Sequence, residues 1–516
     1  MAPYLLNTKI IPQIKSNVKP FSKIFAPSKH KNLLEKTFFV CYNILVTQKR
    51  TPEVLIMKKI SLFLAILIIL SVATSLTSCN DPWTPPTING VSLENFTIVY
   101  DFEGLDYNKR AAEYIQNMSD KRYGVKLEIL DDSAAQGEHE IVVGETSRPI
   151  SEKLEAECEG FEFAILANEG SVALEGDYFV IAAAAYFFME TYASSEAQVS
   201  TVPETVSVHE PIVKEAKNFI LLIGDGMGVY QTKLFEYMEN NVEYSDGEDF
   251  FYGYLFPYMG SSRTDSLSGT TDSAAGGTAL ACGIKTINGY IGRDENLNDV
   301  KSLTELASEL GKATAVMSTE VKSGATPASF SAHADERGET SHILNSIYAT
   351  QDKYGTIIEC GYNYYNTKYM GIIEGKVEDT LAKISEDKDG FFIMYEEAYI
   401  DKQCHDNNID GTFNALVRFN QVIARFMEFA FYNPETFVLI TADHETGMLY
   451  PEEDGTLAYH HDDHSSDDVL IFAYGVGAEL FNGQNVENIQ IAHTIAALMG
   501  EESFGDQSTY QSLTKK

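Results

Sequence analysis

Short apolar runs alternate with amphipathic stretches along the second half of the chain. Residues 218–223 form a continuous apolar run, the pattern of a parallel strand buried on both faces. Further strands are predicted at 313–317, 391–395, 437–441 and 469–474, and helices at 301–310, 377–385, 413–431 and 489–499. This alternation predicts an α/β fold with a doubly wound, mostly parallel sheet flanked by helices.

A shorter α/β pattern precedes this region. Strands are predicted at 96–100, 141–143 and 161–166, and helices at 108–118 and 176–191. Residues 140–146 resemble part of the non-catalytic domain that precedes the barrels of hexosaminidases and α-glucuronidases. We interpret residues 95–205 as a small α/β accessory domain, joined by a linker near 202–211 to a larger domain at 215–516.

Residues 57–78 have the pattern of a bacterial lipoprotein signal peptide. Two lysines follow Met57, an apolar run covers 60–73, and Leu-Thr-Ser precedes Cys79. The run is too short for a good membrane span, and a buried core helix is the alternative interpretation. We therefore expect export and a membrane anchor on lipidated Cys79, facing the periplasm or the cell surface.

The ends of this segment follow from the same interpretation. Residues 1–56 precede Met57, the expected start, and are interpreted as an untranslated or disordered extension. Residues 79–94 contain several prolines, which exclude regular structure, and are interpreted as a tether.

The composition restricts the partners of the chain. A formal net charge of -37 argues against nucleic acid or an anionic membrane surface as a general partner. An anionic substrate would need a locally positive site, which metal ions and an arginine can provide. The four cysteines beyond Cys79 show no CxxC spacing, so neither a zinc ribbon nor a redox motif is indicated, and their pairing stays open.

Polar groups follow three of the predicted strands, at the edge where sites gather in open α/β sheets. These groups are Asp225, Glu396, Asp401, His405, Asp443 and His444. An isolated Asp after a strand is usually a helix cap, and an isolated His is usually structural. Their recurrence at one sheet edge favours metal ligation, because carboxylate and imidazole groups suit zinc.

Asp401 and His405 are four residues apart, which places them on one face of a helical turn. Their third ligand could be His460, His461 or His464. Asp225, Asp443 and His444 offer ligands for a second ion, and two ions about 3.5–4 Å apart form a clamp suited to phosphoryl transfer.

Residues 270–279 place a hydroxyl beside a carboxylate, ahead of an Ala/Gly-rich run. Ser273 could act there as a nucleophile, because a helix start favours a bound anion; an ordinary helix cap is the alternative. Arg337 has a guanidinium that can hold two phosphate oxygens, and a surface arginine is its alternative.

From about residue 217 to the C-terminus, the chain resembles an alkaline phosphatase. The resemblance rests on residues 222–228, 271–275, 278–279, 283–286, 288–289, 325–328, 391–392, 400–403 and 441–444, with His333, Arg337, Glu396 and His405. It implies an alkaline phosphatase catalytic domain at 215–516, which hydrolyses phosphate monoesters.

The resemblance also implies roles for single residues. Ser273 would be the nucleophile that becomes a phosphoserine, and Arg337 would clamp the phosphoryl group. One zinc ion would bind Asp401, His405 and His464, the second would bind Asp225, Asp443 and His444, and a magnesium ion would bind Asp225, Thr326 and Glu396. His464 is chosen because its spacing to residues 473–475 matches the family.

Two positions depart from the family pattern. Gly324 stands where many bacterial members have an aspartate, two residues before Thr326, which leaves the occupancy and identity of the third ion open. Cys404 stands where an aspartate is common before His405, and it could be a soft ligand or an inert packed thiol.

Other functions remain as alternatives at this point. A phosphodiesterase on the same fold needs room for a second ester group. A sulfatase needs a C/S-x-P-x-R signature, which Ser273-Ala274-Ala275-Gly276-Gly277 lacks. A binding module derived from a phosphatase is disfavoured by the retained ligand set. The physiological substrate, the membrane leaflet of the anchor and the presence of a homodimer stay open.

Overall fold

The computed structural model describes residues 85–514, apart from 155–157, 195–198, 239–249 and 362–369. The expected signal peptide, Cys79 and residues 1–56 lie outside the described residues. Among the helices that are described, none combines the length and apolar character that crossing a bilayer requires. Residues 85–516 belong to one compact unit, which contains two large sheets.

The larger sheet has eight strands. Its order is β13 (Ile357–Cys360), β12 (Ala313–Ser318), β14 (Phe391–Glu397), β10 (Asn218–Gly224), β15 (Thr436–Thr441), β20 (Val469–Tyr474), β11 (Tyr258–Arg263) and β21 (Asn485–Glu487). Neighbouring strands are parallel except where β20 pairs with β15 and β11. The prediction of a mostly parallel sheet is therefore confirmed, with β20 as the one reversed strand in it.

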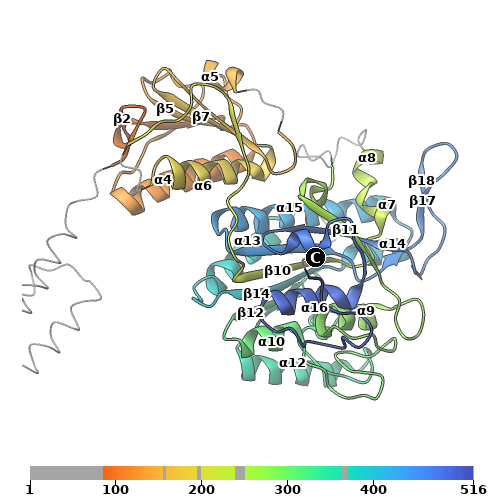
Figure 1. The fold of residues 1–516 in the computed structure, drawn as a ribbon. Helices are drawn as coiled ribbons and strands as arrows, with labels where there is room; N and C mark the ends of the chain where they lie inside the picture. The colour runs from red at the N-terminus through yellow and green to blue at the C-terminus, as the bar shows by residue number, and fades with distance from the viewer. Residues whose placement is uncertain (1–84, 155–157, 195–198, 239–249, 362–369, 515–516) are drawn as a thin grey trace, which may run out of the picture. The chain divides into compact units, whose positions relative to one another are not determined.

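Side chains alternate between the two faces of this sheet, as strand geometry requires. On β10, Phe219, Leu221 and Ile223 enter one hydrophobic core, whereas Ile220 and Leu222 enter the other. Helices α9 (Ser273–Cys282), α10 (Leu303–Glu309) and α16 (Asn488–Leu498) supply the first core. Helices α13 (Met370–Ile384) and α15 (Ile409–Tyr432) supply the second, so helices cover both faces (Figure 1).

The direction of the strands determines where polar groups can gather. β12, β14, β10 and β15 are mutually parallel, so their carboxyl ends share one edge of the sheet. Because β20 runs the other way, the chain that leads into it also lies at this edge. That chain includes the short strand β19 (His464–Ser465), which pairs with β16 (Glu445–Thr446).

The smaller sheet has six strands, in the order β4 (Ile129–Asp131), β3 (Thr97–Tyr100), β5 (Glu140–Val143), β7 (Ser171–Glu175), β6 (Phe163–Asn168) and β9 (Ser207–His209). Its helices are α4 (Asp106–Tyr123), α5 (Pro149–Lys153) and α6 (Ile181–Thr191). Regular structure is present in the described part of the expected tether, residues 85–94. β1 (Thr87–Ile88) and β2 (Val91–Ser92) precede the sheet, and Ile88 and Leu93 are buried.

The expected linker near 202–211 also takes part in structure. β9 lies inside it and pairs with β6, and Val202 is buried. The remaining described elements are β8 (Val199–Ser200), α7 (Val229–Thr232), α8 (Leu234–Met238), α11 (Ala325–Ser329), α12 (Thr340–Tyr354), α14 (Tyr399–His405), β17 (Leu449–Pro451) and β18 (Leu457–Tyr459), with several short 3-10 turns.

Candidate active site

The ends of three adjacent strands carry the acidic groups of the candidate site. Asp225 directly follows β10, Glu396 is the second-to-last residue of β14, and Asp443 follows β15 by two residues. All three residues are buried. Three carboxylates at one buried edge repel one another unless cations or protons compensate them.

Ser273 is the first residue of α9, and Asp272 is the residue that caps the helix. Asp272 Oδ1 accepts a hydrogen bond from the backbone N–H of Ala275 at 3.0 Å. Asp272, and not Ser273, is therefore the residue that caps the helix. The Ser273 hydroxyl is left available at a helix N-terminus, where the helix dipole favours an anion.

Glycines allow the backbone segments of the site to approach one another. A Cβ on Gly276 would lie 2.9 Å from the backbone oxygen of Asp443. Gly226 has a φ of +72°, and a Cβ there would lie 2.8 Å from the Cα of Asp401. Side chains at these two positions would separate α9 from the end of β15, and the end of β10 from α14.

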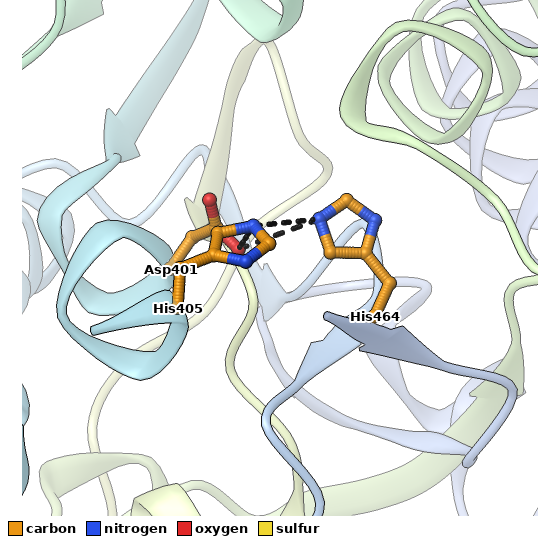
Figure 2. A group of neighbouring side chains, drawn as sticks. All are labelled: Asp401, His405 and His464. Carbon is orange, nitrogen blue, oxygen red and sulfur yellow. Dashed lines mark hydrogen bonds and ion pairs between the residues drawn. The ribbon is translucent and has the colours of Figure 1, made fainter. Parts of the chain in front are cut away.

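The first group of candidate ligands is formed by Asp401 and His405 of α14 and His464 of β19. Figure 2 shows the two imidazoles facing one another beside the carboxylate. His405 Nε2 lies 3.1 Å from His464 Nε2, and Asp401 Oδ1 lies 3.4 Å and 3.6 Å from these two nitrogens. The structure thus brings together the three residues expected to bind one zinc ion.

His464, rather than either neighbouring histidine, reaches this group. His460 is exposed and its Nε2 lies 3.4 Å from Glu452, while His461 is exposed beside Asp462. Of the three histidines that could supply the third ligand, only His464 is therefore in position to do so.

Hydrogen bonds on the far side of each ring fix which nitrogen carries the proton. His405 Nδ1 lies 2.7 Å from the carbonyl oxygen of Asp462, and His464 Nδ1 lies 2.8 Å from that of Thr271. A carbonyl only accepts, so each Nδ1 donates, and in the neutral rings both Nε2 atoms present lone pairs. Two lone pairs and a carboxylate oxygen then converge on one point, which is the donor set of a cation site.

The second group surrounds His444 and includes the candidate nucleophile. His444 Nε2 lies 3.2 Å from Ser273 Oγ, 3.4 Å from Asp225 Oδ1 and 3.5 Å from Asp443 Oδ2. His444 is fully buried, and its ring stacks on that of His464 with centroids 3.7 Å apart. The second set expected to bind zinc is therefore also assembled, directly beside Ser273.

Thr446 joins the two groups, and the reasoning from sequence missed it. Its hydroxyl donates to Asp401 Oδ1 at 2.6 Å and lies 3.2 Å from His444 Nδ1. Because the hydroxyl proton goes to the carboxylate, the Thr446 oxygen is free to accept from His444 Nδ1. This leaves His444 Nε2 unprotonated toward the site. Asp401 also lies within reach of both groups, whereas the predicted ligand sets used it in one.

Unpaired buried oxygens are a second observation that fits the binding of divalent cations. Four buried oxygens of the predicted ligands have no hydrogen-bond partner of good geometry: Asp225 Oδ1, Asp443 Oδ2, Glu396 Oε1 and Thr326 Oγ1. Buried polar atoms are rarely left unpaired in folded proteins. Each of the four belongs to a residue that the sequence placed in the second zinc site or the magnesium site, so bound cations would account for them.

Burial and mutual repulsion shift the ionisation of these groups. Burial, followed by the neighbouring carboxylates, raises the pKa values of Asp225 and Asp443 well above their usual range. Burial and the charge of Glu320 raise the pKa of Glu396 to about 7. Burial, with His464 and His405 nearby, lowers the pKa of His444.

These shifts predict how the metal-free protein responds to pH. Near pH 6.5 His444 is partly protonated in the unfolded state alone, so its contribution to stability rises by about 0.4 kcal/mol up to pH 7.5 and is level above that pH, which is less than the effect of the three carboxyls. The buried carboxyls keep protons in the folded state that they release on unfolding, so stability falls as the pH rises. In chelator, we expect Tm to fall by roughly 2–4 °C more than in zinc and magnesium between pH 6.5 and 8.5.

Differential scanning fluorimetry measures this effect, with the metal-loaded protein in the same buffers as the control. A chelated protein whose Tm stays level or rises over this range would contradict the expected state of the three carboxyls.

Arg337 is held next to the nucleophile by the residue that caps α9. Its Nη1 donates to Asp272 Oδ2 at 3.1 Å, and Asp272 immediately precedes Ser273. The Arg337 side chain is 39% exposed, so it can meet a ligand from solvent. Its remaining N–H groups stay available for an anion at Ser273.

Cys404 is a buried thiol beside the first group. Its Sγ lies 3.2 Å from Tyr459 Oη and 3.7 Å from Thr412 Oγ1, and burial raises the pKa of the thiol to about 12. The protonated, hydrogen-bonded thiol supports packing and not metal ligation. The other described cysteines, Cys158, Cys282 and Cys360, are also free thiols.

A model of the alkaline phosphatase family matches residues 216–360 and 365–451. The chain is 30% identical over 293 residues to alkaline phosphatase 3 of Bacillus subtilis (strain 168). The aligned segment covers 47% of this chain and 63% of that protein. It is 29% identical over 333 residues to alkaline phosphatase 4 of the same organism, which covers 54% and 72%.

A solved structure, alkaline phosphatase from the Antarctic bacterium TAB5, is 26% identical, with a TM-score of 0.49 over 56% of this chain and 99% of that one. For alkaline phosphatase 3 of Bacillus subtilis, the chain spans just under two thirds of that protein's length.

Proposed function

We propose that this chain hydrolyses phosphate monoesters through a phosphoserine formed on Ser273, because residues 216–360 and 365–451 match the alkaline phosphatase family. The observation that carries the proposal is the position of Ser273 Oγ, 3.2 Å from His444 Nε2, at the edge of the converging carboxylates and imidazoles. A nucleophile so close to cation ligands suits attack on an anionic ester.

The ligand groups define what would be bound. Asp401, His405 and His464 would hold one zinc ion, and Asp225, Asp443 and His444 the other, while Asp225, Thr326 and Glu396 would contribute to a magnesium site. When bound, these ions would lower the pKa of a hydroxyl and offset the negative charge of the phosphoryl group.

The chain's own residues would orient the ester. The N-terminus of α9 presents its dipole to the phosphoryl group. Arg337, fixed by Asp272, would grip two phosphoryl oxygens on the side of the nucleophile. A monoester dianion uses this guanidinium better than a diester monoanion does, which favours the monoesterase over the phosphodiesterase alternative.

Replacing Arg337 tests its part in this arrangement. Arg337→Ala is expected to lower kcat/KM for a phosphate monoester by about 10²–10³-fold, because a charged donor to the phosphoryl oxygens is lost. Steady-state assays on a chromogenic monoester measure the loss. Arg263→Ala is a matched control, since Arg263 has a similar exposure of 43% and also pairs with a carboxylate, that of Glu487. Equal activities of the two variants would exclude the clamp.

A second assay separates the candidate functions. The chain without residues 1–79 is assayed on a chromogenic monoester and on a chromogenic diester, with chelation and zinc add-back. The proposal expects zinc-dependent turnover with monoester preference. Preference for the diester would favour the phosphodiesterase, and no turnover with zinc present would favour a binding module.

We further propose that the protein is exported and anchored through a lipid on Cys79. This proposal rests on residues 57–79 alone, with their basic start, apolar run and Leu-Thr-Ser-Cys ending. It would bring the catalytic region to substrates outside the cytoplasm.

A further inference from the structure

Gly324 leaves a space near the third cation site that another side chain fills. Gly324 precedes α11, with a φ of −59° that any residue adopts, so its backbone does not require glycine. A Cβ built on Gly324 would instead collide with the carboxylate of Glu320, including Oε2, and would lie 2.7 Å from Glu320 Cγ. The Glu320 carboxylate therefore lies where a side chain at residue 324 would begin.

Glu320 is tied to the buried Glu396 by a short chain of bonds. The Glu320 backbone N–H donates to Ser318 Oγ at 2.8 Å, and the Ser318 hydroxyl donates to Glu396 Oε2. The two residues are therefore joined through Ser318, although Glu320 comes from the loop after β12 and Glu396 from β14.

One positive side chain lies among these acids. Lys402 Nζ donates to Glu320 Oε1 at 2.8 Å, and no other described side chain bonds Oε2. One lysine cannot balance the ionised carboxylates of Glu320, Glu396 and Asp225, so the ionised site requires a further positive charge.

Two buried oxygens show where that charge belongs. Thr326 Oγ1 and Glu396 Oε1 are fully buried and close to one another, but neither has a hydrogen-bond partner of good geometry. Hydroxyl and carboxylate oxygens of this kind are the ligands that magnesium prefers.

We propose that Glu320 supplies the carboxylate that Gly324 lacks, and that it holds a third divalent cation together with Glu396 and Thr326. The inference rests on the proposed function, because it concerns a cation site of the same centre. The carboxylate reaches the site from four residues upstream, and Lys402 positions it through Oε1.

Metal content and magnesium affinity test this proposal without relying on turnover. The full-length protein is loaded with zinc and magnesium, desalted, and measured by mass spectrometry of its metals, and magnesium binding to the zinc-loaded protein is followed by calorimetry. Glu320→Gln is expected to keep two zinc ions and to weaken magnesium binding at least about 10-fold. Glu359→Gln is the matched control, because Glu359 is 28% exposed, against 23% for Glu320, and also pairs with a lysine.

A relocation of the carboxylate distinguishes ligation from loss of folding. Glu320→Ala combined with Gly324→Asp removes the collision and returns a carboxylate to residue 324, and it is expected to restore magnesium binding to within a few-fold of the wild type. Wild-type magnesium affinity in Glu320→Gln, failure of the double variant to regain binding, or a wild type that binds two zinc ions and no third ion would each overturn the inference. A wild type that binds no zinc would overturn the proposed function itself.

Discussion

Ser273→Ala is expected to lower kcat for a phosphate monoester by at least about 1,000-fold while leaving the zinc content unchanged. Removal of a catalytic nucleophile has effects of this size or larger. The side chain is small and begins a helix that Asp272 caps, so the substitution leaves the cap intact. Steady-state assays and metal analysis of the same preparation measure the two quantities together.

Ser268→Ala is the control, since Ser268 is an exposed serine upstream in the same loop. Its activity is expected to stay within a few-fold of the wild type. If Ser273→Ala kept its activity, another group would have to be the nucleophile. If it lost zinc as well, its low activity would not report on the nucleophile.

Asp225→Asn is expected to remove at least one metal ion per chain and to lower activity at least about 100-fold. Asp225 Oδ1 is buried without a hydrogen-bond partner and lies 3.4 Å from His444 Nε2, so its negative charge is the feature that the site needs. Cations that offset phosphoryl charge contribute several kcal/mol to such reactions. Metal analysis and the monoester assay check both expectations.

The smaller sheet offers a control for this experiment. Asp101, Asp131 and Asp132 also form a cluster of carboxylates. They are half-buried, and their oxygens accept hydrogen bonds from nearby backbone N–H groups such as those of Phe102, Glu103 and Ser147. Asp101→Asn is therefore expected to change neither metal content nor activity. A similar loss in both variants would point to a general effect of removing acidic charge.

The buried parts of the fold could be predicted from sequence, and the partly exposed ones could not. β10, β14 and β15 are buried on both faces, so their sequences are continuous apolar runs, and the predicted bounds differ from the observed ones by at most two residues. β11 contains Gly, two Ser and Arg, and it is a strand because β20 and β21 pair with it. Its hydrogen bonds come from distant chain, which local pattern does not reveal.

The candidate site divides in the same way. Asp225, Asp443 and His444 could be found because they follow strands whose ends meet at one edge. Thr446, Asp272 and Glu320 could not, because their roles depend on partners far along the chain. Asp272 meets Arg337 across 65 residues, and Thr446 meets Asp401 across 45. The exchange of a carboxylate between positions 324 and 320 likewise becomes visible only when side-chain positions are known.

The most direct test of the proposed mechanism is to trap the covalent intermediate. The zinc-loaded protein is mixed with labelled phosphate, quenched at low pH and digested, and the labelled peptide is sequenced by mass spectrometry. The account predicts one labelled residue, Ser273, and no label in Ser273→Ala. Label that persists in Ser273→Ala, or that lies on another residue of the wild type, would contradict it.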